Sequence, residues 1–290
     1  MNILVAGATG AVGRLLVPLL LKEGHQVTGV SRTPEGVERV RRQGASAVQA
    51  DAFDRDALRR VMAATAPDAV IHQLTALSDA DGETTNRLRR EGTRNLVDAA
   101  RSAGVERIVA QSISWAYVPG ETPADETEPL DLGAAEPRRG MVEGIRALEE
   151  TAAEMETCVA LRYGILYGPG TWYAPGGAVA AALASDPNAR LLANLEADLS
   201  VTSFVHVADA ARATVAALGW PSGPVNIVDD ELAEGRQWLP VLAAALGVPA
   251  PEERTGRQNE ARGASNERAR SRGWEPEHTT WRYGFAAQDV

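Results

Sequence analysis

Cysteine, lysine and long apolar runs are nearly absent from this sequence. Among its 290 residues there is one cysteine, Cys158, and one lysine, Lys22. A single cysteine excludes an internal disulfide, and its position in an apolar run favours a buried, unreactive thiol. No apolar run approaches the roughly 20 residues that span a bilayer, and the first residues lack the pattern of a secretory signal. We therefore expect a cytoplasmic protein without a membrane partner.

Basic side chains are scarce relative to acidic ones. The sequence has 39 acidic and 29 basic residues, which gives a formal net charge of -10. Nucleic-acid-binding proteins generally present a basic surface, so we expect no nucleic-acid partner and regard a small molecule as the better candidate. No metal site is predicted. A homodimer stays open as the oligomeric state.

What the sequence does contain is a regular alternation of β-type runs and amphipathic helical stretches. The expected strands are 2–6, 26–31, 47–50, 69–73, 107–112 and 157–166, and the expected helices are 13–22, 34–43, 55–64, 83–103 and 140–153. This alternation is typical of a parallel sheet with helices on both faces. The sequence thus predicts an α/β fold, a Rossmann-type doubly wound parallel sheet with a smaller C-terminal substrate lobe.

Three glycines follow the first expected strand and open the first expected helix, at positions 7, 10 and 13. Backbone amides of such a loop approach a pyrophosphate closely, and the helix N-terminus stabilises its charge. The loop therefore predicts dinucleotide binding, with a purely structural turn as the alternative. We expect residues 1–167 to form the dinucleotide-binding domain and residues 168–290 the substrate lobe, with segments near 201–228 returning to the core.

The end of the second strand bears on the choice of cofactor. An acidic residue there would bind the adenosine ribose and repel a 2′-phosphate. Here the residues are Ser31 and Arg32, and a guanidinium beside a hydroxyl suits a phosphate. NADPH is the predicted cofactor, and NADH is the alternative.

An ordered set of motifs resembles the extended or atypical branch of the short-chain dehydrogenase/reductase superfamily, in the style of the NAD-dependent epimerase/dehydratases. The set covers nearly the whole chain and comprises the glycine loop 7–13, Asp51-Ala52, 92–100, 162–170, 203–212, 225–227 and 264–274. The resemblance and the strand ends together assign cofactor contacts to Gly7, Thr9, Gly10, Ala11, Val12, Gly13, Ser31, Arg32, Asp51, Ala52, Gln73, Leu74 and Thr75.

The proton-transfer pair that the resemblance implies is missing. Relatives carry a Tyr and a Lys four residues later, yet residues 118–162 contain no Tyr, Lys or His. Anchoring the helix on Glu149 puts Met141 and Ile145 at the two positions. Shifting the anchor by one residue puts Val142 and Arg146 there, so neither register restores the pair.

Two residues remain as catalytic candidates, Ser112 and Tyr117. Ser112 ends the fifth strand and can hydrogen-bond a carbonyl oxygen, although a serine polarises more than it protonates and can instead cap the strand. Tyr117 can present its phenol to the site or pack structurally. Arg89 stands where many relatives carry an asparagine, so the usual proton relay is also in doubt. Water or the substrate itself are the other proton sources.

The leading hypothesis is the NADPH-dependent reduction of a ketone on a bulky, aromatic secondary metabolite, as in atypical relatives that act on aromatic polyketides in antibiotic biosynthesis. The side chains of Trp115, Tyr163, Trp172 and Tyr173 are candidates for stacking on a planar ligand, or else they belong to the core. Loss of the pair favours a second hypothesis, a catalytically silent NADP(H)-binding regulatory protein. A sugar-nucleotide epimerase or dehydratase is the third.

Overall fold

A seven-stranded sheet is the largest element of the protein. The computed structural model describes residues 1–76, 82–184, 195–258 and 261–286, and its main sheet has the strand order β10-β6-β5-β4-β1-β2-β3. Its strands are β1 (Asn2–Ala6), β2 (Gln26–Ser31), β3 (Ser46–Gln49), β4 (Ala69–His72), β5 (Arg107–Ile113), β6 (Thr157–Tyr163) and β10 (Gly223–Ile227). Two further sheets of two strands each pair β7 (Ile165–Tyr167) with β9 (Phe204–His206) and β8 (Val201–Thr202) with β11 (Ala233–Glu234). The predicted fold class is confirmed.

The strand order reverses beside β1, which places the loop after β1 at a switch point of the sheet. Ile3 of β1 lies between Val27 of β2 and Ala69 of β4 in parallel register. All four residues of β4 are buried. Such continuous burial is typical of parallel strands that are covered by helices on both faces, and ligands of these sheets bind beyond the carboxyl ends of the strands at the switch point.

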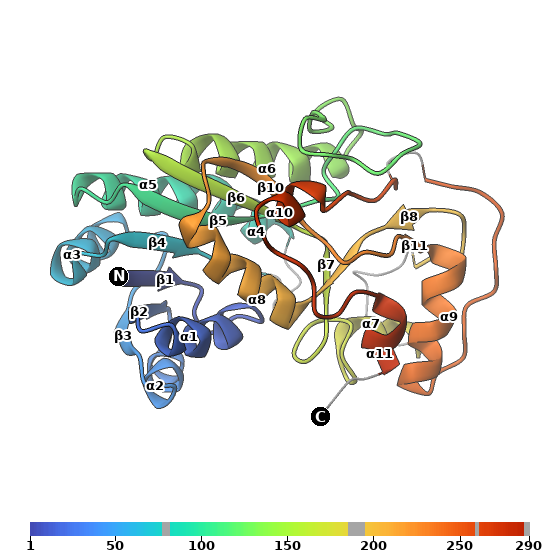
Figure 1. Cartoon of the computed structure of the whole chain (residues 1–290), viewed down its shortest axis with the longest axis horizontal. Helices are drawn as coiled ribbons and strands as arrows, with labels where there is room; N and C mark the ends of the chain where they lie inside the picture. The colour runs from blue at the N-terminus through green and yellow to red at the C-terminus, as the bar shows by residue number, and fades with distance from the viewer. Residues whose placement is uncertain (77–81, 185–194, 259–260, 287–290) are drawn as a thin grey trace. The chain divides into compact units, whose positions relative to one another are not determined.

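Helices cover both faces of this sheet. The helices of the described chain, in both of its compact units, are α1 (Gly13–Lys22), α2 (Pro34–Arg42), α3 (Arg55–Thr65), α4 (Gly82–Arg87), α5 (Thr93–Ser102), α6 (Arg138–Ala152), α7 (Ala178–Leu183), α8 (Val207–Ala216), α9 (Gly235–Leu246), α10 (Glu267–Ser271) and α11 (Trp281–Ala286), with a π-helical turn, η2 (Leu88–Gly92), and a 3-10 turn, η4 (Ala217–Gly219). Figure 1 shows α1 and α2 on one side and α3, α5 and α6 on the other, where α3 packs against α5 and α5 against α6.

Side-chain caps define where two of these helices begin. The Thr33 hydroxyl accepts a hydrogen bond from the Gly36 amide at 3.1 Å at the start of α2. The Asp54 carboxylate accepts one from the Ala57 amide at 2.8 Å at the start of α3. Each cap satisfies an amide that the first helical turn leaves without a partner.

Two expected elements are interrupted. The expected helix 83–103 contains the π-helical turn η2, and turns of this kind break the regular hydrogen-bond ladder and are frequent at functional sites. The expected strand 157–166 breaks at Gly164, where a Cβ would lie 2.7 Å from the Ser203 carbonyl oxygen. That close approach of two backbones explains the break, since no side chain fits there.

The chain forms two compact units that interleave along the sequence. Unit 1 comprises residues 1–112, 132–161 and 211–224, and unit 2 comprises residues 113–131, 162–210 and 225–290. The core of unit 2 is rich in aromatic rings, with the Phe204 ring 5.2 Å from the rings of Trp238 and Phe285. The main core of unit 1 is aliphatic and includes Leu4, Leu96 and Ile108.

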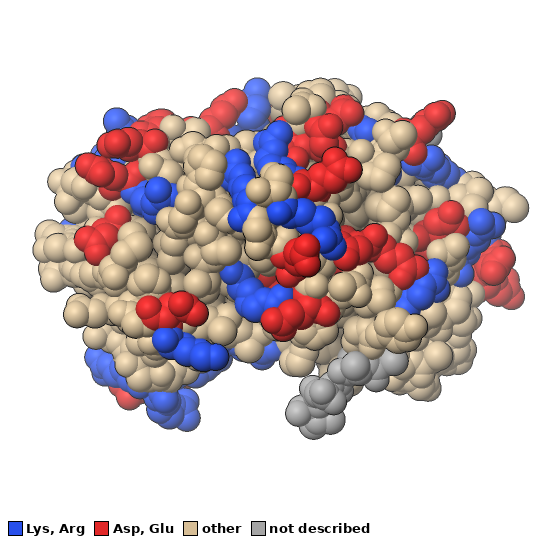
Figure 2. Space-filling model, viewed as in Figure 1, with Lys and Arg blue, Asp and Glu red and all other residues tan. Residues whose placement is uncertain are grey.

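The surface carries both signs of charge. Figure 2 shows acidic and basic side chains interspersed over the face that it presents. Arg94 and Arg101 both pair with Glu154, for example. Within the described residues, no helix is long and apolar enough to cross a membrane, and no group of three or more His, Cys, Asp or Glu side chains is arranged to hold a metal ion.

Candidate functional site

The glycine loop brings three backbone segments into close contact. Gly7 has a φ of +92°, and a Cβ on it would lie 2.4 Å from the Gln73 carbonyl oxygen. A Cβ on Gly13 would lie 2.2 Å from the Gly7 carbonyl oxygen. Glycine is needed at both positions because any side chain would force the loop away from β4 or from the first turn of α1. The loop therefore holds the N-terminus of α1 where it can stabilise a phosphate.

The remaining predicted loop residues complete this turn. The Gly10 amide donates to the Gly7 carbonyl at 3.1 Å, and the Leu16 amide donates to the Val12 carbonyl at 2.9 Å as α1 begins. Thr9 and Ala11 are half-buried. The geometry suits a pyrophosphate, and the contacts themselves stay a prediction.

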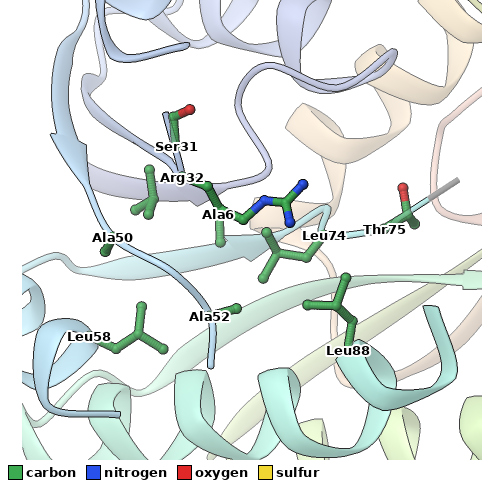
Figure 3. A pocket seen from close by; sticks show the side chains of 10 residues that line it. Ala6, Ser31, Arg32, Ala50, Ala52, Leu58, Leu74, Thr75 and Leu88 are labelled. Atoms are coloured by element: carbon green, nitrogen blue, oxygen red, sulfur yellow. The ribbon is translucent and has the colours of Figure 1, made fainter. Parts of the chain in front are cut away.

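A pocket lies beyond the carboxyl ends of β1 to β4 (Figure 3). Five of the predicted cofactor residues line it: Ser31, Arg32, Ala52, Leu74 and Thr75. Its other lining residues are Ala6, Val30, Ala50, Leu58 and Leu88. The Arg32 side chain extends toward Leu74 and Thr75. A guanidinium at the mouth of an otherwise apolar pocket fits a purine ring with a charged substituent.

The sequence reasoning missed this apolar lining. Ala6 ends β1, Val30 is the residue before the end of β2, and Ala50 follows β3, and this position near strand ends was the available signal. Leu58 and Leu88 come from α3 and η2, and no local pattern separates them from ordinary core residues.

The predicted residues Asp51 and Gln73 hold backbone in place. The Asp51 carboxylate is exposed and accepts a hydrogen bond from the Phe53 amide at 2.8 Å. Gln73 is buried, and its backbone N–H donates to the Ala6 carbonyl at 2.7 Å. Both residues flank the pocket in the chain, next to Ala52 and Leu74. Their contacts with a cofactor stay a prediction.

His72 is a buried anchor for the pocket wall. Its Nδ1 accepts from the Leu74 amide at 3.2 Å, and its Nε2 lies 2.8 Å from the Thr93 hydroxyl. Burial lowers the pKa of His72 to about 4, so the ring is neutral at physiological pH. Because Nδ1 accepts, Nε2 carries the hydrogen and donates to Thr93. This chain ties β4 to the start of α5.

Ser112 is turned toward α6. It is 3% exposed, and its hydroxyl donates to the Glu149 carboxylate at 2.6 Å. Residues at i, i+4 and i+8 share one helix face, so Met141 and Ile145 lie on the same stripe of α6 as Glu149. Arg146 is exposed and faces Glu150 at 3.9 Å. The Ser112 hydroxyl thus meets the stripe of α6 that carries Met141 and Ile145, and the assignment of these two residues to the positions of the missing pair stays a prediction.

Tyr117 is enclosed in unit 2. It is 2% exposed, its hydroxyl donates to Asn226 Oδ1 at 2.7 Å, and it accepts from Arg162 Nη1 at 2.9 Å. Burial raises the pKa of Tyr117 to about 12, with the positive charge of Arg162 opposing the shift. This geometry suits a packing role better than proton donation. The donor roles of Ser112 and Tyr117 stay predictions.

The aromatic candidates divide into core and surface. Tyr163 is 3% exposed and Tyr173 is 7% exposed, and Trp172 packs at the edge of the same aromatic core of unit 2 as Tyr173. Trp115 is 41% exposed. Trp115 is therefore the candidate that keeps a ring face for a ligand.

Comparisons with known proteins agree with this geometry. The sequence pattern of the NAD dependent epimerase/dehydratase family matches residues 3–228. The chain is 42% identical to the 3-diazoavenalumate denitrifying reductase of a Streptomyces species, over 99% of this chain and 100% of the relative. It is 29% identical to the UDP-glucose 4-epimerase of Mycolicibacterium smegmatis, over 96% and 94% of the two chains.

Solved structures of epimerases share the fold of this chain. The UDP-glucose 4-epimerase of Thermus thermophilus, in complex with NAD, matches with a TM-score of 0.76 and 25% identity, over 99% of this chain and 97% of that chain. The UDP-glucose 4-epimerase of Thermotoga maritima, with UDP-glucose, matches with a TM-score of 0.76 and 23% identity, over 99% and 97%.

Proposed function

Because the chain belongs to the NAD dependent epimerase/dehydratase family, we propose that it uses NADPH to reduce a diazo group on an aromatic small molecule, with loss of dinitrogen. The family and the 42% identical reductase establish an NAD(P)-dependent oxidoreductase. The name of that reductase describes removal of nitrogen from a diazo compound. The observation that carries the proposal is the stripe of α6 that meets Ser112, because beside Glu149 it carries the apolar residues Met141 and Ile145 and no tyrosine or lysine.

Ketone reduction needs an acid that these positions do not provide. Hydride addition to a ketone leaves an alkoxide, and a positioned general acid typically contributes about 10²- to 10⁴-fold to the rate. Neither a thioether nor an alkyl side chain donates a proton. Epimerisation through a ketone intermediate would need a group that both takes and returns a proton, so the epimerase alternative is less favoured for the same reason.

Reduction of an arenediazonium ion makes no such demand. Addition of a hydride to the terminal nitrogen forms an N–H bond and gives a neutral aryl diazene, and the cofactor, when bound, would supply that hydride. Water then takes the N–H proton, the C–N bond breaks with loss of dinitrogen, and a proton from water adds to the ring carbon. The sum is ArN₂⁺ + H⁻ → ArH + N₂, in which the diazonium ion is reduced and NADPH is oxidised. No oxyanion forms, so no enzymatic acid is required.

The residues of unit 1 support the choice of NADPH. Arg32 is exposed, and both Arg32 and its neighbour in the sequence, Ser31, line the pocket. Among the described residues no carboxylate lines that pocket, so nothing there repels a 2′-phosphate. When bound, the cofactor would supply the hydride, and the loop 7–13 would bind its pyrophosphate.

An aromatic ketone that carries its own acidic phenol is the second candidate. It is compatible with the same observation, because the substrate and not α6 would stabilise the oxyanion. A catalytically silent regulatory protein is less favoured, since the 42% identical relative is a reductase along its whole length.

Turnover of a simple probe tests the proposal. Purified protein would be incubated with NADPH and isotopically labelled 4-carboxybenzenediazonium, and both NADPH loss and labelled dinitrogen would be measured. We expect one dinitrogen per NADPH. The Gly13→Val variant, whose side chain would collide with the Gly7 carbonyl, provides the uncatalysed rate.

Two outcomes would contradict the proposal. If the wild type consumes NADPH and the diazonium probe no faster than Gly13→Val does, the protein does not catalyse diazo reduction. Faster consumption of hydroxylated aromatic ketones than of the diazonium probe would select the second candidate.

A further inference from the structure

Arg89 of η2 is a buried cation without an acidic partner among the described residues. Its side chain is 8% exposed, and its Nη1 donates to the Asn86 amide oxygen at 3.0 Å. Desolvation lowers the pKa of Arg89 to about 10, and no carboxylate in the described part of the chain offsets this effect. At neutral pH the guanidinium is therefore still charged.

Burying a charge in this state costs free energy unless a ligand pairs with it or accepts its hydrogen bonds. Buried charges in proteins are normally paired, because the loss of water must be repaid by other charges or hydrogen bonds. A guanidinium has five N–H donors in a planar fork, and a neutral amide satisfies only one of them here. The remaining donors suit the two oxygens of a carboxylate, which arginine binds in a bidentate manner.

The position of Arg89 within unit 1 places it at the reacting end of the site. Its neighbour Leu88 lines the pocket assigned above to the adenosine end, whereas Arg89 is not among the residues that line that pocket and lies against α6. A Cβ on Gly144 of α6 would lie 3.4 Å from Arg89 Cδ and 2.9 Å from Asn86 Oδ1. The absence of a side chain at Gly144 thus lets α6 approach Arg89, one residue before Ile145.

The cofactor's own phosphates are accounted for elsewhere. The glycine loop follows β1 and Arg32 follows β2, so the pyrophosphate and the adenosine end lie on that side of the switch point. η2 follows β4 and faces α6, which follows β5. This is the side that the nicotinamide half and the substrate would occupy. The anion that completes Arg89 is therefore expected to belong to the substrate.

We propose that Arg89 binds a carboxylate of the substrate, which makes the substrate class an aromatic carboxylate that bears the reducible group. The proposal rests on the proposed function, because it concerns the substrate of the same site. Arg89 would thereby orient the reducible group toward the nicotinamide. It also gives a reason to retain a buried charge that no acidic residue of the described segments pairs with.

Ligand binding without turnover tests this assignment. The probes are cinnamate and cinnamamide, which share shape and differ in charge, and calorimetry would measure their dissociation constants for the protein saturated with NADP⁺. We expect the wild type to prefer the acid by about tenfold or more, as for hydrogen bonds between charged groups. Arg89→Gln should abolish the preference, and Arg89→Lys should retain part of it.

The ratio of the two constants within one variant separates recognition from structure. A general loss of stability weakens the binding of both probes and leaves the ratio of their dissociation constants unchanged. The matched control is Arg90→Gln, which removes the adjacent, exposed arginine and should keep the wild-type ratio. The preference should also hold at neutral pH and fall as pH rises through about 10, where Arg89 loses its proton.

Clear results would overturn the assignment. Equal affinities in the wild type, including no binding of either probe, would do so, as would an unchanged preference in Arg89→Gln. Because no hydride is transferred in this experiment, its failure is distinguishable from a failure to turn over diazo compounds.

Discussion

The glycine loop and helix α6 lie in the same unit and have kept their family features to opposite degrees. In the loop, Gly7 and Gly13 each stand where a Cβ would come within 2.4 Å of a backbone atom. In α6, the stripe that faces Ser112 carries Met141 and Ile145 in place of a proton-transfer pair. Cofactor binding therefore depends on backbone shape that no substitution could preserve, whereas the acid–base positions changed without loss of the helix.

This difference indicates which part of the chemistry the protein still needs. A hydride donor must be held in place for any reduction, so the loop is indispensable. An acid is needed only if the reduced product is a strong base. Substitutions in the loop should therefore reduce activity more than substitutions in α6.

Gly13→Val should have the largest effect. A side chain 2.2 Å from the Gly7 carbonyl oxygen cannot be accommodated without moving the backbone, and overpacking of this kind typically costs about 1–3 kcal/mol in stability. NADPH affinity, measured by fluorescence titration, should fall by about a hundredfold or more. Gly24→Val is a partial control, since no atom lies within 4 Å of its Cβ position although its φ is +80°; it should retain NADPH binding. Retained binding in Gly13→Val would show that the loop does not hold the cofactor.

The two regions also differ in how far the sequence predicts them. The loop and its flanking strand and helix are set by local pattern, and β1, β2 and α1 have the predicted bounds. The partner of Ser112 and the isolation of Arg89 depend on α6, which lies some 40 to 60 residues away in the chain. Such contacts come from tertiary packing, which no local periodicity encodes. The same reason explains why Leu58 and Leu88 were not assigned to the pocket.

Arg32→Ala should change the cofactor preference. Hydrogen bonds to a charged group are worth about 1.5–3 kcal/mol, so the ratio of kcat/KM for NADPH over NADH should fall by roughly 10- to 100-fold. The change should come from NADPH, with NADH use nearly constant. Arg39→Ala, which removes an exposed arginine from α2, is the matched control. An unchanged ratio would mean that another group recognises the 2′-phosphate, or that NADH is the natural cofactor.

Ser112→Ala tests whether the hydroxyl that contacts Glu149 of α6 has a chemical role. Loss of the 2.6 Å hydrogen bond to the Glu149 carboxylate should lower the free energy of unfolding by about 1.5–3 kcal/mol, measured by urea denaturation. Ser114→Ala, which removes an equally buried hydroxyl, is the control. If diazo reduction needs no acid, kcat should stay within about threefold of the wild type. A fall of a hundredfold or more would instead assign Ser112 to catalysis, because general acid–base and polarising groups have effects of that size.

Met141→Tyr should have the smallest effect on diazo reduction and is the sharpest test of the comparison. It returns a phenol to the half-buried position on the α6 stripe, and Met141→Phe supplies the same bulk without the hydroxyl. Since hydride transfer to a diazonium ion creates no oxyanion, kcat for that probe should be equal in the two variants within about twofold. Reduction of an aromatic ketone should be faster in Met141→Tyr than in Met141→Phe, because the phenol can donate to the alkoxide. Faster diazo reduction in the tyrosine variant alone would mean that a proton limits the native reaction, and α6 would then have lost a group that the chemistry uses.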